Sequence, residues 1–318
     1  MTQHSNTNTS VGASFQKFQN HFFLIPGIFS IVALLAIFMY GLQPGIDLKG
    51  GSLLQVTFPD GRPDLIELQT KVNTLNYGEI RIQPSNQNDY ILRQRELKQT
   101  EKVALDETLA TFGKVEEVQF NSVGPSIGEE LMRKAWWAIG AITLLTIMFI
   151  AFAFRGVSVP VASWKYGVVA IITLLHDILI PVGLFAYLGH TTGAEVGALF
   201  IVALLTILGI SINDTIVVFD RIRENLNHNI KHPKTEPFSA VVWRSVVQTL
   251  TRSINTSVTV IIVLSALFFV GPESTKDFAL TLIVGMVAGT YSSIFLASPL
   301  LILIEKRQKP VVAEVKKK

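Results

Sequence analysis

Ionisable and amide side chains stand inside long apolar stretches of this 318-residue chain. His176 and Asp177 lie near the middle of one stretch, and Asn213 and Asp214 lie toward the end of the next. Such residues are costly inside a membrane and mark ion or proton pathways or ties between helices. A carboxyl group can bind and release a proton, so these residue types allow proton transfer.

Asp214 is the strongest candidate, because its own helix supplies few side chains that could pair with its carboxylate. Its helical neighbours are Ile210 and Ser211 before it and Val217 and Val218 after it. Asp214 therefore needs a partner on another helix, water, or a proton of its own. A proton-carrying role is favoured over a purely structural one.

The pair His176 and Asp177 has two readings of equal weight. It either supports proton movement or ties helices together through hydrogen bonds, with Pro181 loosening the turn that follows.

Arg252 precedes the fifth apolar stretch and is followed by polar side chains that could line a wet path: Asn255, Thr256, Ser257 and Thr259. An arginine at this place also serves as an interfacial anchor, and the residues alone favour that reading.

The composition is that of a membrane protein. Hydrophobic residues make up 49%, the mean hydropathy is +0.43, and charged residues make up 16%, against about 25% in soluble domains. The net charge of +3 comes from basic segments beside apolar stretches, which favours a membrane face over a nucleic-acid surface. The absence of cysteine excludes disulfides and cysteine metal sites.

Familiar hydrolase patterns are absent from the sequence: it has no G-x-x-x-x-G-K-[ST], no H-E-x-x-H and no G-x-S-x-G. We therefore expect no ATP hydrolysis, no metal and no cofactor. Any energy-consuming step would draw on an ion gradient or on a partner ATPase.

Six stretches are long and apolar enough to cross a bilayer, which takes about 20 helical residues. They are residues 22–42, 135–154, 166–188, 196–219, 254–270 and 278–304. The first is too long for a signal-peptide core and no small-residue cleavage pattern follows it, so we expect a retained helix.

Lys and Arg in the short segments fall almost entirely on one side of these spans. The segments on that side are residues 1–21, the loop between the second and third spans, the loop 220–253 and the basic tail 305–318. The positive-inside rule then places both termini in the cytoplasm and the long segment 43–134 outside.

Segment 43–134 has the composition of a soluble α+β domain. Its pattern predicts strands and helices in the order β-α-β-β-α-β, which is ferredoxin-like: residues 53–58, 64–75, 79–83, 89–94, 100–112 and 114–123. Residues 83–86 are expected to separate the two middle strands. Glycines at both tethers, among them Gly45 and Gly128, suggest hinges that let the domain move.

Small residues recur in the last span. Gly285 and Gly289 form a G-x-x-x-G, followed by Ser292 and Ser293. This spacing predicts close helix packing and identifies no partner.

Several longer runs carry a family resemblance: residues 45–51 (GIDLKGG), 123–128 (VGPSIG), 175–177 (LHD), 210–225 (ISINDTIVVFDRIREN) and 248–257 (QTLTRSINTS). With them the chain resembles the SecF branch of the SecD/SecF family, within the resistance-nodulation-division superfamily, along nearly its whole length. The motif positions are Gly45, Asp47, Gly50 and Gly51 after the first span and Gly124 and Pro125 before the second. Leu48 departs from the usual Phe, and the loop 225–243 is somewhat long.

The resemblance implies a membrane unit completed by SecD beside the SecYEG channel of the bacterial cytoplasmic (inner) membrane. YajC, YidC and membrane lipids are further expected partners, and the cargo is a translocating unfolded polypeptide. The implied work is proton-motive-force-driven translocation and release of secretory proteins after the ATPase SecA has pushed them. Asp214 and Arg252 match the family's proton-path acid and arginine, with Asn213 and Ser211 beside them and His176, Asp177, Thr256 and Ser257 in support.

Two other functions stay open. One is a proton-driven exporter of small molecules or lipids from the same superfamily, which one small outer domain disfavours. The other is a scaffold of the channel complex that transports nothing, in which the buried acids only tie helices together.

Overall fold

The computed structural model describes residues 22–153, 161–230 and 236–307. The elements group into two compact units, one containing the long apolar helices and the other formed by residues 43–137 with 195–198. In chain order the described elements are α2 (Leu24–Tyr40), α3 (Ile46–Lys49), β1 (Gly51–Thr57), α4 (Leu65–Asn73), β2 (Arg81–Ser85), β3 (Asp89–Gln94), α5 (Gln99–Ala110), β4 (Glu116–Val123), α6 (Pro125–Ala153), α7 (Ser163–Thr191), α8 (Ala198–Ile230), α9 (Phe238–Val270), α10 (Glu273–Ser292), the π-helix η1 (Ser293–Ala297) and α11 (Ser298–Lys306).

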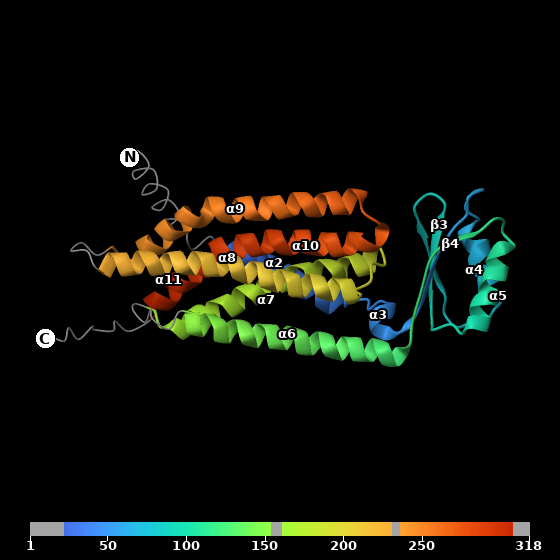
Figure 1. The fold of residues 1–318 in the computed structure, drawn as a ribbon, viewed down its shortest axis with the longest axis horizontal. Coiled ribbons are helices and arrows are strands. Elements are labelled where there is room, and N and C mark those ends of the chain that lie inside the picture. Colours follow the sequence, from blue (N-terminus) through green and yellow to red (C-terminus); the bar gives the residue numbers. More distant parts are fainter. Residues whose placement is uncertain (1–21, 154–160, 231–235, 308–318) are drawn as a thin grey trace. The chain divides into compact units, whose positions relative to one another are not determined.

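The small unit contains a four-stranded antiparallel sheet in the order β2-β3-β1-β4. Its strands and helices follow one another along the chain in the predicted order, and α4 and α5 lie on one side of the sheet (Figure 1). Alternate residues such as Leu54 and Val56 of β1 and Leu92 of β3 point into the core between sheet and helices. That alternation follows from the two-residue period of a strand.

The turn between β2 and β3 differs from the sequence expectation. Pro84 and Ser85 belong to β2, where Pro84 pairs with Tyr90, and the turn begins at Asn86. A proline is tolerated here because β2 is an edge strand, so the missing N–H removes no hydrogen bond from a neighbouring strand. Asn86 takes a left-handed conformation with φ of 45°.

Within the described residues, five helices are long and apolar enough to cross a membrane: Pro125–Ile150, Ser163–Thr191, Ala198–Asn229, Phe238–Val270 and Ser274–Lys306. Leu24–Tyr40 is equally apolar in character but shorter, at 17 residues. It packs along α7, where Gly183 leaves room for Ala33. The protein is thus a polytopic helical membrane protein with a small sheet-containing unit.

Two helices extend well beyond the apolar stretches. α8 continues to Ile230 and α9 already begins at Phe238, so most of segment 220–253 is helical. Trp243 and Val246 on α9 and Ile222 on α8 are buried in one hydrophobic cluster, which explains the extension. Arg252 therefore lies inside α9 and not ahead of it.

The last apolar stretch is interrupted by the π-helix η1. Pro299 follows this turn and has no N–H to donate to the carbonyl of Phe295 four residues earlier. The broken hydrogen-bond ladder accounts for the irregular turn. Such turns are often found at functional sites.

Candidate functional site

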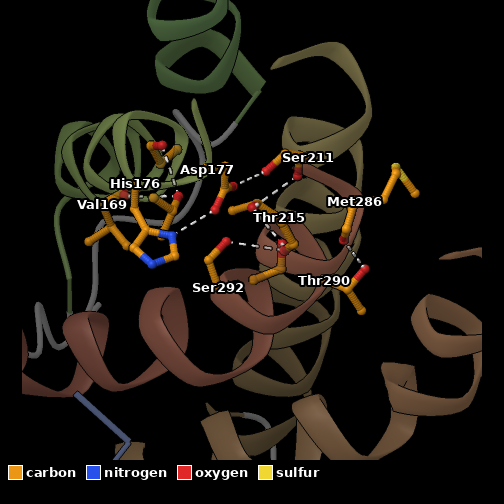
Figure 2. Close-up of polar contacts among 12 residues, drawn as sticks. Val169, His176, Asp177, Ser211, Thr215, Met286, Thr290 and Ser292 are labelled. Atoms are coloured by element: carbon orange, nitrogen blue, oxygen red, sulfur yellow. Dashed lines mark hydrogen bonds and ion pairs between the residues drawn. The ribbon is translucent and has the colours of Figure 1, made fainter. Parts of the chain in front are cut away.

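Asp177 lies in the middle of α7 and is fully buried, with 0% of its surface exposed. Nδ1 of His176 lies 3.0 Å from one carboxylate oxygen, Oδ1. The hydroxyl of Ser211 on α8 donates a hydrogen bond to the other, Oδ2. Figure 2 shows Asp177 between these two partners, so the carboxylate joins α7 to α8.

A third helix closes over this contact through a residue without a side chain. A Cβ added at Gly289 of α10 would lie 3.1 Å from Cβ of Ser211 and 3.6 Å from Oδ2 of Asp177. One turn earlier, a Cβ at Gly285 would lie 2.2 Å from Cδ1 of Ile207. Both glycines of the G-x-x-x-G therefore face α8 and let the backbones approach closely.

Hydroxyl groups continue the polar cluster beside Gly289. Oγ1 of Thr215 on α8 lies 3.1 Å from Oγ of Ser293, the first residue of η1. Ser293 also donates to the carbonyl of Gly289 at 2.8 Å. The predicted packing residue Ser293 thus contacts α8 at the point where the helix geometry changes.

Asp214 lies on α8 one turn after Ser211 and is 6% exposed. It faces α10 across a narrow space that has no room for water, shared with Gly285, Gly289 and Thr290. Within the described parts of the chain, no hydrogen bond or ion pair to its carboxylate is found. The expectation that its own helix cannot satisfy Asp214 agrees with this geometry.

Arg252 is close enough for its charge to act on Asp214, although no ion pair joins them among the described residues. Its side chain is exposed, as are those of Asn213 and Thr256. Ser257 is buried and hydrogen-bonded to Thr290 at 2.5 Å, which brings α9 to the rim of the Asp214 space. Among the predicted residues, Ser211 and Ser257 therefore lie buried near Asp214, whereas the side chains of Arg252 and Asn213 are exposed.

The second cluster of predicted residues lies in the small unit, where the segment after α2 meets the residues before α8. Oδ2 of Asp47 accepts a hydrogen bond from the backbone N–H of Ala198, the first residue of α8, at 3.1 Å. Backbone bonds join Val196 to Gln43 at 2.8 Å and to Gly45 at 2.9 Å. Asp47 thus caps the N-terminus of α8 from a distant part of the chain.

The glycines of this segment are required by close backbone approach. Gly50 has φ of 79°, and a Cβ there would lie 2.6 Å from Cα of Pro125. A Cβ at Gly128 would lie 2.7 Å from the backbone nitrogen of Gly50, and one at Gly51 2.6 Å from the carbonyl oxygen of Gln94. These contacts hold the beginning of β1 against the beginning of α6.

Sequence reasoning missed Glu195, which lies between α7 and α8. Its Oε2 is 3.1 Å from Nε of Arg93 on β3. Burial raises the pKa of the Glu195 carboxyl, and the positive charges of Arg93, Arg81 and Lys49 offset part of that rise. No signal in the sequence connects the two residues, because a single Glu in a short loop has no periodicity.

No group of three or more His, Cys, Asp or Glu side chains that could hold a metal occurs within the described residues.

Comparison with known proteins gives matches over almost the whole chain. The family described as "Protein export membrane protein SecD/SecF, C-terminal" matches residues 104–307, and "SecD/SecF GG Motif" matches residues 35–58. "Protein translocase subunit SecF" of Thermobaculum terrenum is 42% identical over 300 residues, which cover 90% of this chain and 92% of that protein. The chain belongs to the SecD/SecF family.

Further relatives agree with this assignment. "Protein translocase subunit SecF" of a Synechocystis species is 38% identical over 91% of this chain and 93% of that protein. The crystal structure of SecDF from Thermus thermophilus, titled a translocon-associated membrane protein, matches with a TM-score of 0.80 and 31% identity. The match covers 92% of this chain but only 38% of the SecDF chain.

Most residues of the two clusters lie within the SecD/SecF matches, whereas Arg81, Arg93 and Gln94 lie outside them. The GG-motif region contains Gly45, Asp47, Gly50 and Gly51, and the C-terminal region contains Asp177, Ser211, Asp214 and Gly289. The matches show the family to which the chain belongs.

Proposed function

We propose that this chain works as the SecF subunit of a Sec protein-export complex and uses the proton motive force, together with SecD, to complete translocation and release of secretory proteins. The observation that carries the proposal is the match of SecF relatives over about nine-tenths of the chain. Buried acids inside a helix bundle support it, because they supply what a proton-driven step requires.

SecD is the expected partner. The SecDF chain contains much more protein than this chain matches. Only 11% of the most apolar stretch of α6 and 17% of that of α9 are buried, which leaves apolar helix surface for other chains and for lipid. We infer that SecD covers part of this surface beside the SecYEG channel, and that YajC and YidC associate with the complex.

The membrane topology in this proposal has six spans, at residues 22–42, 135–154, 166–188, 196–219, 254–270 and 278–304. Both termini and segment 220–253 face the cytoplasm of a bacterial inner membrane, and segment 43–134 lies outside as a ferredoxin-like domain. The sheet order β2-β3-β1-β4 supports the ferredoxin-like description, since that fold has the same strand order. Reporter fusions decide the topology: an active cytoplasmic reporter within segment 53–123 would contradict it.

Asp214 is the proposed proton carrier, with Arg252 as the charge that acts on it. In the structure Arg252 is exposed and forms no ion pair with Asp214 among the described residues, so the relay requires α9 to approach and withdraw. A second solved SecDF structure, titled a super-membrane-facing form, has a TM-score of 0.64 at the same 31% identity. This chain is therefore less similar in shape to that form than to the other SecDF structure.

Release of a secretory protein from membrane vesicles, measured with and without a proton gradient, tests the proposal. Asp214→Asn keeps the size and removes the titrating group, so gradient-dependent release should be lost while the protein still inserts. Asp220→Asn is the matched control, because Asp220 is exposed on the same helix. Arg252→Lys should be partly tolerated, since lysine keeps a charge but can lose it when desolvated.

Release by Asp214→Asn vesicles that equals wild type and still depends on the gradient would favour the scaffold function instead. Loss of release in both Asp214→Asn and Asp220→Asn would indicate a general defect and would also count against the relay.

A further inference from the structure

His176 and Asp177 form a buried pair that is joined by no Lys or Arg side chain among the described residues. Asp177 is 0% exposed and His176 is 7% exposed. Among the residues that the structure describes, the partners of the carboxylate are His176 and Ser211, and no Lys or Arg forms an ion pair with it. An ionised Asp177 beside a neutral imidazole would leave one net negative charge inside the bundle.

A single proton removes that charge, and it could reside on either residue. On His176 it would create an imidazolium whose second N–H, at Nε2, is buried and has no hydrogen-bond partner in the described chain. On Asp177 it would lie at Oδ2, where Ser211 supplies an oxygen to accept it. Nδ1–H of a neutral His176 could still donate to Oδ1. With the proton on Asp177 and a neutral His176, every N–H and O–H donor of the pair has an acceptor. This arrangement is therefore favoured.

We propose that Asp177 is a second proton-binding site of the protein, linked to Asp214 through the hydroxyl of Ser211. This inference rests on the proposed proton-driven function and adds a second acid to it. Binding is a simple protonation: the carboxylate takes one H⁺ at Oδ2 and becomes a neutral acid, and the reverse step returns the proton.

Ser211 is the link because its single hydroxyl proton can serve only one acceptor at a time. When Asp177 is ionised, Ser211 donates to Oδ2. When Asp177 is protonated, the acid donates to Ser211, and the hydroxyl proton is free to turn toward the space that Ser211 shares with Asp214. The protonation state of one acid thus changes the hydrogen bonding offered to the other.

The groups that face the pair come from several helices. α8 contributes Ser211 and, one turn on, the titratable Asp214, and α10 contributes Gly289. His176 also lines a cavity of about 440 Å³, together with Ser30 of α2 and Leu296 of η1. Apart from His176 and Ser30, the residues that line this cavity are apolar.

Infrared absorption of the purified full chain in lipid tests the site without any transport assay. A protonated carboxylic acid has its own carbonyl stretching band. We expect such a band in the wild type, its persistence in Asp214→Asn and its loss in Asp177→Asn. Superimposable spectra of wild type and Asp177→Asn would overturn the proposal.

If Asp177→Asn fails to fold, Ser211→Ala decides the same question. Removing the hydroxyl should shift the band of the Asp177 acid, because its hydrogen-bond partner is lost. Ser292→Ala is the matched control, since Ser292 is equally buried and bonds to the carbonyl of Gly289. An unshifted band in Ser211→Ala would contradict the link.

The vesicle assay separates the second site from the proposed function itself. In Asp177→Asn, the amide can keep the hydrogen bonds to His176 and Ser211. If Asp177 only ties the helices together, the variant should release as much secretory protein as wild type. If Asp177 is a proton site, the variant should release only as much as is released without a gradient. If release by the wild-type protein did not depend on the proton gradient, the proposed function would be wrong. The infrared band would still test the protonation of Asp177. A band lost in Asp177→Asn together with normal gradient-dependent release would overturn the link to transport.

Discussion

The carboxylate of Asp47 accepts a hydrogen bond from the backbone N–H of Ala198, a residue 151 positions later in the chain. Asp47 belongs to the short segment that leads into β1, and Ala198 is the first residue of the helix that contains Asp214. At 1.5 Å per residue, Asp214 lies about 24 Å further along the helix axis. The GG-motif segment therefore supplies a hydrogen bond to the first residue of α8.

Replacing Asp47 by Ala should loosen the beginning of α8. Loss of a helix cap costs about 1 kcal/mol, and loss of the negative charge at the positive end of the helix dipole adds to it. Asp47→Asn should cost less, because the amide oxygen still accepts the bond. Hydrogen exchange at the amides of residues 196–199 measures the effect, with Asp60→Ala in the exposed turn after β1 as the control. Unchanged protection in Asp47→Ala would contradict the cap.

Gly50→Ala should destabilise the small unit by about 1–3 kcal/mol, because the new Cβ would be 2.6 Å from the backbone of Pro125 and φ is positive. Thermal unfolding of the full chain in detergent measures this change. Gly140→Ala in α6 is the matched control, since a Cβ there meets nothing within 4 Å. Equal unfolding temperatures for the two variants would show that the close approach of Gly50 to Pro125 does not contribute to stability.

Gly289→Ala should separate α10 from α8 at the Asp177 contact. The added methyl would lie 3.1 Å from Cβ of Ser211, so the helices must shift by a few tenths of an ångström. We expect a loss of stability of about 1 kcal/mol and a shift in the infrared band assigned to Asp177. Gly209→Ala on α8 serves as the control, because open space surrounds that position. A band unchanged in Gly289→Ala would argue that Gly289 does not set the Asp177–Ser211 geometry.

Glu195 should make stability depend on pH in a defined direction. Its pKa is raised by burial, although Arg93 offsets part of the rise. A carboxyl whose folded-state pKa is raised favours the folded state at low pH, and this contribution is lost as the pH rises through the raised pKa. Between about pH 4 and neutrality, wild type should lose stability relative to Glu195→Gln, measured by chemical denaturation at each pH. A stability difference that stays constant over this range would refute the effect.

The sequence alone was enough for the class of protein and for the elements of the small unit. Apolar stretches are decided by local composition, and strand alternation appears in neighbouring residues such as Leu54 and Val56. Asp214 could be singled out for the same reason, since its helical neighbours are visible in the sequence. The ends of α8 and α9 could not be predicted from the sequence. The extension of these helices depends on the contact of Trp243 and Ile222 within one hydrophobic cluster.

Only the tertiary structure decided which polar residues meet. Ser211 could serve Asp177, Asp214 or its own backbone as far as spacing is concerned, and the packing of α7 against α8 selects Asp177. The same holds for Asp47 with Ala198 and for Arg93 with Glu195, whose partners are distant in the chain. Hydrophobic periodicity reports only which face of an element is buried, whereas a hydrogen bond between elements depends on their register and distance, which packing sets.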